Sequence, residues 1–217
     1  MTIPYFEKKP SLFLIFLFVI VIPLLHIVSG FIFAIKFHPY LQLLILLIPS
    51  AWAIQSLTLK DSSHMEKINS DILWVMMLSC MISLFINLFL PYWNQVFPIP
   101  REIEKMIESL MHKGQPWGVW IDIVSLAMVP AVCEEFYFRG VLQTSFCHYL
   151  SPQGGRWLAA FFFAFYHFNP WYFPFYVLLG LFFGWIFIRT RHLGLAVFAH
   201  FLNNFVSILL YHYTSWV

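Results

Sequence analysis

Three groups of polar side chains interrupt the apolar C-terminal half of the chain, and their residue types suit hydrolytic chemistry. In chain order the groups are Glu134, Glu135 and Arg139; then His167; then His200, Asn203 and Asn204. A carboxylate can take a proton from water as a general base, and a histidine can share or relay that proton. An Asn amide and an imidazole N–H can donate hydrogen bonds to a developing oxyanion. Together these side chains predict a site that activates water for hydrolysis.

The spacing within each group predicts which side chains share a helix face. Glu135 and Arg139 are four residues apart, so a helix places them on one face, where they can form a salt bridge. Glu134 lies about 100° further around the same helix and is free to face a cavity. His200 and Asn204 have the same four-residue spacing and present together. We therefore expect Glu134 to react and the Glu135–Arg139 pair to support the helix.

The composition shows why charged groups in this region need a function. The chain has 217 residues, of which 61% are hydrophobic and only 10% are charged, and the mean hydropathy is +0.78. Soluble domains carry about 25% charged residues, so the expected fold class is an all-α polytopic membrane protein with one compact domain. A carboxylate in the hydrocarbon core costs at least about 2.5–3.5 kcal/mol, and two adjacent ones indicate a functional site.

About seven transmembrane or half-membrane helices are expected, because a bilayer crossing needs about 20 apolar residues. The apolar segments are 12–35, 40–58, 72–90, 117–149, 156–168, 171–189 and 194–213. The segment 156–168 is too short, since it spans about 20 Å of a core that is about 30 Å thick. Its end, at His167 and the Asn169-Pro170 break, is therefore expected within the membrane. Irregular backbone at that depth is tolerated only where protein or a cavity surrounds it.

The chain divides into three parts by sequence pattern. Residues 1–100 hold N-terminal transmembrane helices in which no motif is recognised. Residues 101–116 begin with apolar side chains at helical spacing among charged ones. This pattern predicts an amphipathic helix at the membrane interface or, alternatively, a solvated connector. Residues 117–217 are the expected catalytic helical core, because they contain all of the polar groups described above.

Basic residues outside the expected spans indicate the orientation in the membrane. The N-terminal side has Lys8, Lys9, Lys60, Lys67, Arg156, Arg189 and Arg191, and the opposite side has Lys36, Arg101, Lys105 and Lys113. By the positive-inside rule this excess predicts a cytoplasmic N-terminus. The compact form and short connections are typical of a prokaryotic protein, so the expected location is the prokaryotic cytoplasmic membrane.

Three short motifs, each on its own hydrophobic segment, carry a resemblance to a known family. They are E-E-x-x-x-R at 134–139, F-x-x-x-H at 163–167 and H-x-x-x-N at 200–204. In this order they resemble the CAAX protease and bacteriocin-processing (CPBP or Abi) family of intramembrane glutamic endopeptidases, which includes the type II CAAX prenyl endopeptidase. Each motif is weak alone, but the three together in a membrane protein are specific. The resemblance covers residues 117–213.

The resemblance implies a role for each matching residue. Glu134 activates water with the assistance of His167, and His200 with Asn204 stabilises the oxyanion. The resemblance also implies a metal-independent reaction, without a cofactor, on a membrane-anchored protein or peptide in the lipid bilayer. Bacterial relatives process other membrane peptides, so a prenylated substrate is not the expectation. The net charge of only +2 gives no indication of a nucleic-acid partner.

Zinc chemistry is an alternative use of the same side chains. Glu134, His167 and His200 have the donor types of a zinc site, although no H-E-x-x-H motif is present. The remaining histidines, among them His112 and His212, are assigned no role, and His212 has no acidic neighbour in the sequence. Neither a disulfide framework nor a zinc-binding pair is expected from the three cysteines, Cys80, Cys133 and Cys147.

Two alternatives to an enzyme also remain open. A bacteriocin-immunity or membrane scaffold protein would bind a partner through the same cavity without catalysis. A transporter would use Glu134 as a proton site, but transporters are typically built from internal repeats and paired broken helices. The sequence shows no internal repeat and one broken helix, so the transporter ranks last.

Overall fold

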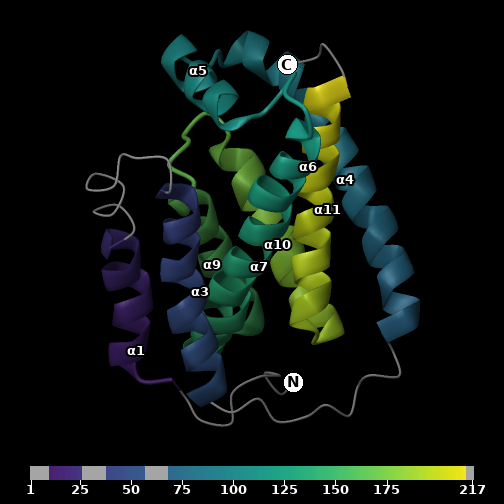
Figure 1. Ribbon diagram of the computed structural model, residues 1–217. Helices are drawn as coiled ribbons and strands as arrows, with labels where there is room; N and C mark the ends of the chain where they lie inside the picture. Colours follow the sequence, from purple (N-terminus) through teal and green to yellow (C-terminus); the bar gives the residue numbers. More distant parts are fainter. Residues whose placement is uncertain (1–9, 26–37, 57–67, 214–217) are drawn as a thin grey trace.

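The computed structural model describes residues 10–25, 38–56 and 68–213, and every regular element within these ranges is helical (Figure 1). The predicted all-α class is therefore confirmed. Besides a long central run, the helices are α1 (Leu12–Phe16), η1 (Leu17–Val21), α3 (His38–Ser56), α4 (Ile68–Val96), α5 (Arg101–Leu110), α9 (Pro152–Tyr166), α10 (Phe173–Thr190) and α11 (Leu193–Tyr213).

Three helices are long and apolar enough to cross a membrane by length and composition. They are Ile72–Val96 within α4, all of α10 and all of α11. Two shorter apolar helices cover Leu12–Leu25 and Leu44–Ala53. The remaining parts of the first two expected spans, 26–35 and 57–58, lie outside the described residues. The chain is thus an integral membrane protein, while the count of about seven crossings stays a prediction.

One continuous helical run, from Gly118 to Tyr149, passes through the centre of the bundle (Figure 1). It alternates α-helical with wider π-helical segments, which are α6 (Gly118–Asp122), η3 (Ile123–Met128), α7 (Val129–Glu135), η4 (Phe136–Gln143) and α8 (Thr144–Tyr149). Thr144 Oγ1 donates to the carbonyl of Arg139, five residues earlier, at 2.8 Å, which is the separation of a π-helical turn. Such turns are frequent at functional sites, and both glutamates lie between the two π segments.

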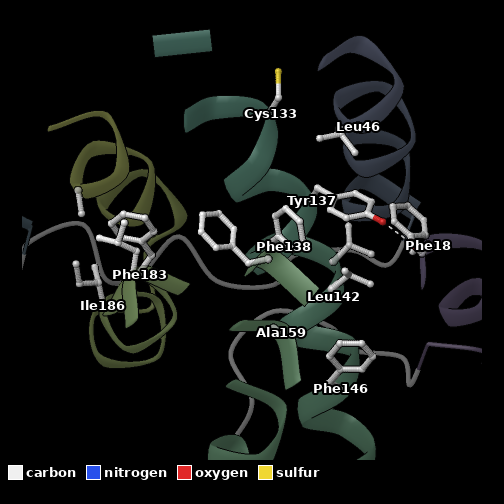
Figure 2. Packing of buried hydrophobic residues seen from close by; sticks show 14 of the residues in the cluster. Phe18, Leu46, Cys133, Tyr137, Phe138, Leu142, Phe146, Ala159, Phe183 and Ile186 are labelled. Atoms are coloured by element: carbon white, nitrogen blue, oxygen red, sulfur yellow. Dashed lines mark hydrogen bonds between the residues drawn. The ribbon is translucent and has the colours of Figure 1, made fainter. Parts of the chain in front are cut away.

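Apolar side chains of other helices pack on both sides of this central run (Figure 2). Phe18 of η1 and Leu46 of α3 lie on one side, and Phe183 and Ile186 of α10 lie on the other. All four side chains are fully buried. The Tyr137 hydroxyl donates to the carbonyl of Phe18, which ties the N-terminal helix to the central run. The core therefore surrounds the segment that follows the two glutamates.

Helix α9 ends at the break that the sequence predicts. Its 15 residues span only about 22 Å, and His167 follows as the C-terminal cap. Phe168 then takes a left-handed conformation, with φ of 48°, which is a common way to end a helix. The N–H of Tyr172 donates to Asn169 Oδ1 at 3.1 Å, and α10 begins at the next residue. This turn holds His167 at the end of a helix, next to a change of chain direction.

Polar side chains join α4 to α11 beside the third polar group. Ser83 Oγ donates to the carbonyl of Asn203 at 3.0 Å, and Asn87 Nδ2 donates to Ser207 Oγ at the same distance. On each helix the two partners are four residues apart, so they share a face. Hydrogen bonds of this kind between membrane helices contribute about 0.6 kcal/mol each on average. These hydrogen bonds favour one rotation of α11 about its axis. That rotation sets the direction in which His200 and Asn204 point.

The amphipathic segment forms α5, which lies across the end of the bundle where α6 begins and α11 ends (Figure 1). The predicted helix is confirmed over Arg101–Leu110, and none of its residues is buried. Two of its apolar side chains, Met106 and Leu110, are exposed. Exposed apolar side chains on a helix with a charged face fit a membrane interface, and this placement stays a prediction.

Helices α9 and α10 approach closely at Gly180, where a side chain has no room. A Cβ atom built on Gly180 would lie 2.9 Å from the Cα and 3.0 Å from the Cβ of Ala160. We expect Gly180→Ala to lower the free energy of unfolding by about 1–3 kcal/mol, because the two backbones must separate. Chemical unfolding in detergent micelles measures this change.

Gly154→Ala is the matched control for that variant. The nearest atoms to a Cβ at Gly154 belong to the side chains of Leu150 and Ser151, at 3.3 Å. Alanine is the better helix former, so this change should be neutral or slightly stabilising. Equal stability of the two variants would contradict the close approach of α9 and α10.

Candidate active site

Glu135 is the charged centre of the site and has no exposed surface. Its Oε1 atom lies 2.8 Å from Nη1 of Arg139 and 2.8 Å from Nδ1 of His200. The predicted pair of Glu135 with Arg139 is therefore present. The contact with His200 is not anticipated by the sequence, in which His200 was expected to share a cavity with Glu134. One carboxylate oxygen thus links the central run to α11.

Arg139 is held from several directions inside the protein, with only 1% of its surface exposed. Its Nη2 donates to the carbonyl of Gly180 at 2.8 Å. The guanidinium carbon lies 4.7 Å from the ring centre of Phe163 and 5.5 Å from that of Phe183, within the range of cation–π attraction. The arginine therefore connects α7 and η4 to α10 as well as balancing the charge of Glu135.

Glu134 has a different environment from its neighbour. Its Oε2 atom is buried without a hydrogen-bond partner and lies 3.9 Å from Nε2 of His167. Oε2 of Glu135 also lacks a partner, but the other oxygen of Glu135 is engaged twice. A distance of 3.9 Å is too long for a direct hydrogen bond, and a water molecule bridging the two groups would satisfy the Glu134 oxygen. The structure thus brings Glu134 and His167 together as expected.

The hydrogen bond of His167 determines its tautomer. Nδ1 lies 2.7 Å from the carbonyl oxygen of Phe163, four residues earlier on α9. A carbonyl oxygen only accepts, so Nδ1 carries the proton. In the neutral ring Nε2 then has a free lone pair, and this is the atom that faces Glu134. Phe163, the first residue of the F-x-x-x-H motif, therefore holds His167 through its backbone carbonyl and contacts Arg139 through its ring.

Asn204 lies against the central run, one helical turn beyond His200 on α11. Its Nδ2 donates to the carbonyl of Leu126 in η3 at 3.4 Å. Its Oδ1 accepts a hydrogen bond from Nδ2 of Asn203 at 3.2 Å. The structure thus holds the amide of Asn204 between two helices, and the long bond to Leu126 is a weak one.

The described residues contain no set of three or more His, Cys, Asp or Glu side chains arranged to hold a metal ion. The three donors of the zinc alternative, Glu134, His167 and His200, are divided between two places. His167 faces Glu134, whereas His200 contacts Glu135. The metal-independent reaction itself stays a prediction.

A buried carboxylate with two histidine partners lies at the end of the bundle near α5. Asp122 has no exposed surface, and its carboxylate lies 2.6 Å from Nδ1 of His112 and 2.8 Å from Nε2 of His212. It also accepts the backbone N–H of His112 at 3.0 Å. His212 thus has an acidic partner in space, although it has no acidic neighbour in the sequence and no role was predicted for it. No sequence pattern marks this contact, because 90 residues separate Asp122 from His212.

An apolar cavity of about 760 Å³ lies among η1, η4, α9 and the turn before α10. Its walls include Tyr137 and Phe138, one turn after Glu134, and Tyr166, which precedes His167. None of the proposed catalytic residues lines it. The cavity is therefore a neighbour of the site, with space for an apolar chain.

Residues 116–206 match the family model described as type II CAAX prenyl endopeptidase Rce1-like. The matched segment contains all three motifs on which the sequence resemblance rests, and that resemblance is confirmed. No curated protein and no solved structure matches the chain. The roles of individual residues stay predictions.

Replacing Arg139 by methionine leaves the Glu135 carboxylate buried with only His200 beside it. We expect Arg139→Met to lower the free energy of unfolding by about 3–5 kcal/mol, because an uncompensated buried charge remains. Chemical unfolding in detergent micelles measures the change. Arg191→Met is the control, because Arg191 is exposed and its loss should cost less than about 0.5 kcal/mol. A loss at Arg139 no larger than that at Arg191 would refute the structural role of the ion pair.

Proposed function

We propose that the protein is an intramembrane glutamic endopeptidase, on the premise that residues 116–206 match the family model of the type II CAAX prenyl endopeptidase Rce1-like proteases. It hydrolyses a peptide bond in a membrane-anchored protein or peptide. Glu134 is the proposed general base and His167 is its partner. The proposed reaction uses neither a metal ion nor a cofactor.

The relation between Glu134 and His167 is the observation that carries this proposal. Their facing atoms are 3.9 Å apart, and both atoms are acceptors when the ring is neutral. A water molecule between them donates one O–H to the carboxylate and the other to Nε2. Its lone pairs are then free to attack a carbonyl carbon, which is the arrangement that hydrolysis needs.

The proposed reaction has two steps. Glu134 takes a proton from the water while the water oxygen bonds to the carbonyl carbon, and the C=O electron pair moves onto the carbonyl oxygen. The tetrahedral intermediate then collapses, the C–N bond breaks, and the proton passes from Glu134 to the leaving nitrogen. The products are a carboxylic acid and an amine, and Glu134 is a carboxylate again. General acid–base catalysis of this kind contributes about 10²–10⁴-fold to the rate.

His200 and Asn204 are the proposed donors to the oxyanion. Nδ1 of His200 faces the Glu135 carboxylate, so Nε2 can donate as well only when the ring is an imidazolium. Two positive groups, His200 and Arg139, would then balance the carboxylates of Glu134 and Glu135, as a buried site requires. Asn204 offers a second donor, because its amide nitrogen carries two hydrogens and the bond to a backbone carbonyl at 3.4 Å uses one of them.

The cavity beside the site supports an apolar, membrane-anchored substrate. Two of its walls come from the part of the central run that follows Glu134 and from α9, which ends before His167, so a bound chain would lie near both residues. Pockets of this size and character hold ligands mainly through apolar contact. Cleavage of a C-terminal CAAX segment would be one case within this substrate class. A prokaryotic cytoplasmic membrane and a cytoplasmic N-terminus stay predictions from composition and charge.

Removing the proposed base tests this function directly. We expect Glu134→Gln to slow cleavage of a quenched membrane-peptide library at least about 100-fold, because glutamine cannot take the proton from water. His200→Ala should slow cleavage about 10²–10³-fold through loss of an oxyanion donor. The rates are measured with the purified protein in proteoliposomes.

Glu108→Gln is the matched control, since Glu108 lies exposed on α5, and it should cleave at the wild-type rate. Equal cleavage by the wild type and Glu134→Gln would reject Glu134 as the base. If the wild type cleaves nothing and Glu134→Gln keeps its cellular phenotype, the scaffold or immunity alternative is favoured.

A further inference from the structure

Five rings form a continuous array through the candidate site, and two of them are the histidines. Tyr176 stacks on His167, with ring centres 4.0 Å apart and planes at 23°. Phe163 lies between the histidines, 4.6 Å from His167 and 5.7 Å from His200. Phe183 stacks on His200 at 4.8 Å, with planes at 14°. This aromatic array therefore encloses each histidine between two other rings.

Helix α10 supplies the ring at each end of the aromatic array. Tyr176 and Phe183 are seven residues apart, which is about two helical turns, so both face the site. Gly180 lies between them on the same face, and its carbonyl accepts a hydrogen bond from Arg139 at 2.8 Å. The missing side chain at Gly180 also lets α9 approach. One face of α10 thus contacts both histidines and the buried arginine.

The hydrogen bond of His167 restricts its ring only in part. Nδ1 donates to the carbonyl of Phe163 at 2.7 Å, which sets the tautomer but still permits the ring to rock about that bond. The broad torsional preference of an imidazole ring does not prevent this motion. A flat ring stacked on the imidazole does prevent it, whereas a flexible aliphatic side chain offers no matching surface. The direction of Nε2 toward Glu134 therefore depends on what lies against the ring.

We propose that Tyr176 is a positioning residue for His167, whose imidazole plane it holds so that Nε2 points toward Glu134 and the water between them. This inference rests on the proposed function and adds to it a residue that lies outside the three motifs. Phe183 lies against His200 in the same manner, so α10 offers a flat ring to each histidine. Tyr176 is only partly buried and packs against the core from its edge, so replacing its ring should disturb the core less than replacing a fully buried ring.

Replacing the Tyr176 ring separates positioning from packing. In Tyr176→Leu we expect kcat for the fastest-cleaved quenched peptide to fall about 10- to 100-fold, because the base partner is misdirected. KM should change less than about twofold, since the substrate still binds. Tyr176→Phe keeps the ring and should restore kcat to within about twofold of the wild type.

Phe175→Leu is the matched control for lost aromatic packing. Phe175 is the neighbouring residue on α10, it is buried, and its ring lies 5.2 Å from Trp93 and 6.1 Å from Phe89. The change removes a comparable ring that contacts neither histidine. Its kcat should therefore equal that of the wild type even if its stability falls.

A readout independent of catalysis is the ¹⁵N spectrum of the histidine side chains. The His167 signals are assigned by their absence in His167→Gln. We expect the wild type, Tyr176→Phe and Phe175→Leu to show one tautomer of His167, protonated at Nδ1. In Tyr176→Leu the tautomer should persist, because the Phe163 carbonyl still accepts from Nδ1, whereas the Nε2 signal should shift or broaden as the ring rocks relative to Glu134.

Unchanged His167 signals in Tyr176→Leu, or an equal loss of kcat in Phe175→Leu, would overturn the role of Tyr176. A wild-type protein that cleaves no peptide would overturn the proposed function instead. In that case the nitrogen signals of His167 would still decide whether Tyr176 positions the ring.

Discussion

A single buried carboxylate oxygen, Oε1 of Glu135, holds the site together because it lies 2.8 Å from both Arg139 and His200. These contacts join the central run to α11, and the hydrogen bond from Arg139 to the carbonyl of Gly180 extends the connection to α10. A buried charge is tolerated only when it is paired and hydrogen-bonded. The three helices must therefore meet at this point, and the arrangement of the bundle around the site follows from that requirement.

The same requirement separates the two adjacent glutamates. Glu135 is engaged by two partners, whereas Oε2 of Glu134 is buried without a hydrogen-bond partner and faces His167 across 3.9 Å. Neighbouring residues on a helix point about 100° apart, so one carboxylate can lie against α11 while the other faces the end of α9. This division suits hydrolysis. Glu134 can gain and lose a proton while Glu135 keeps its contacts with Arg139 and His200.

Local spacing predicted the parts of the site that lie on one helix, and it missed the parts that form between helices. The pair of Glu135 and Arg139 follows from a four-residue separation, and the end of α9 follows from an apolar segment too short to cross the membrane. Nothing in the spacing decides which of two adjacent glutamates His200 contacts, because the rotation of α11 depends on its packing against α4. The contact of Asp122 with His212 spans 90 residues and was missed for the same reason.

The central claim is that Glu135 is structural and Glu134 is reactive, and the unfolding free energies of two matched variants compare them directly. Glu135→Gln and Glu134→Gln are unfolded chemically in detergent micelles beside the wild type. We predict that Glu135→Gln loses about 3–5 kcal/mol, because Arg139 and His200 lose the negative charge between them. Glu134→Gln should stay within about 1 kcal/mol of the wild type. A larger loss in Glu134→Gln than in Glu135→Gln would contradict this division of roles.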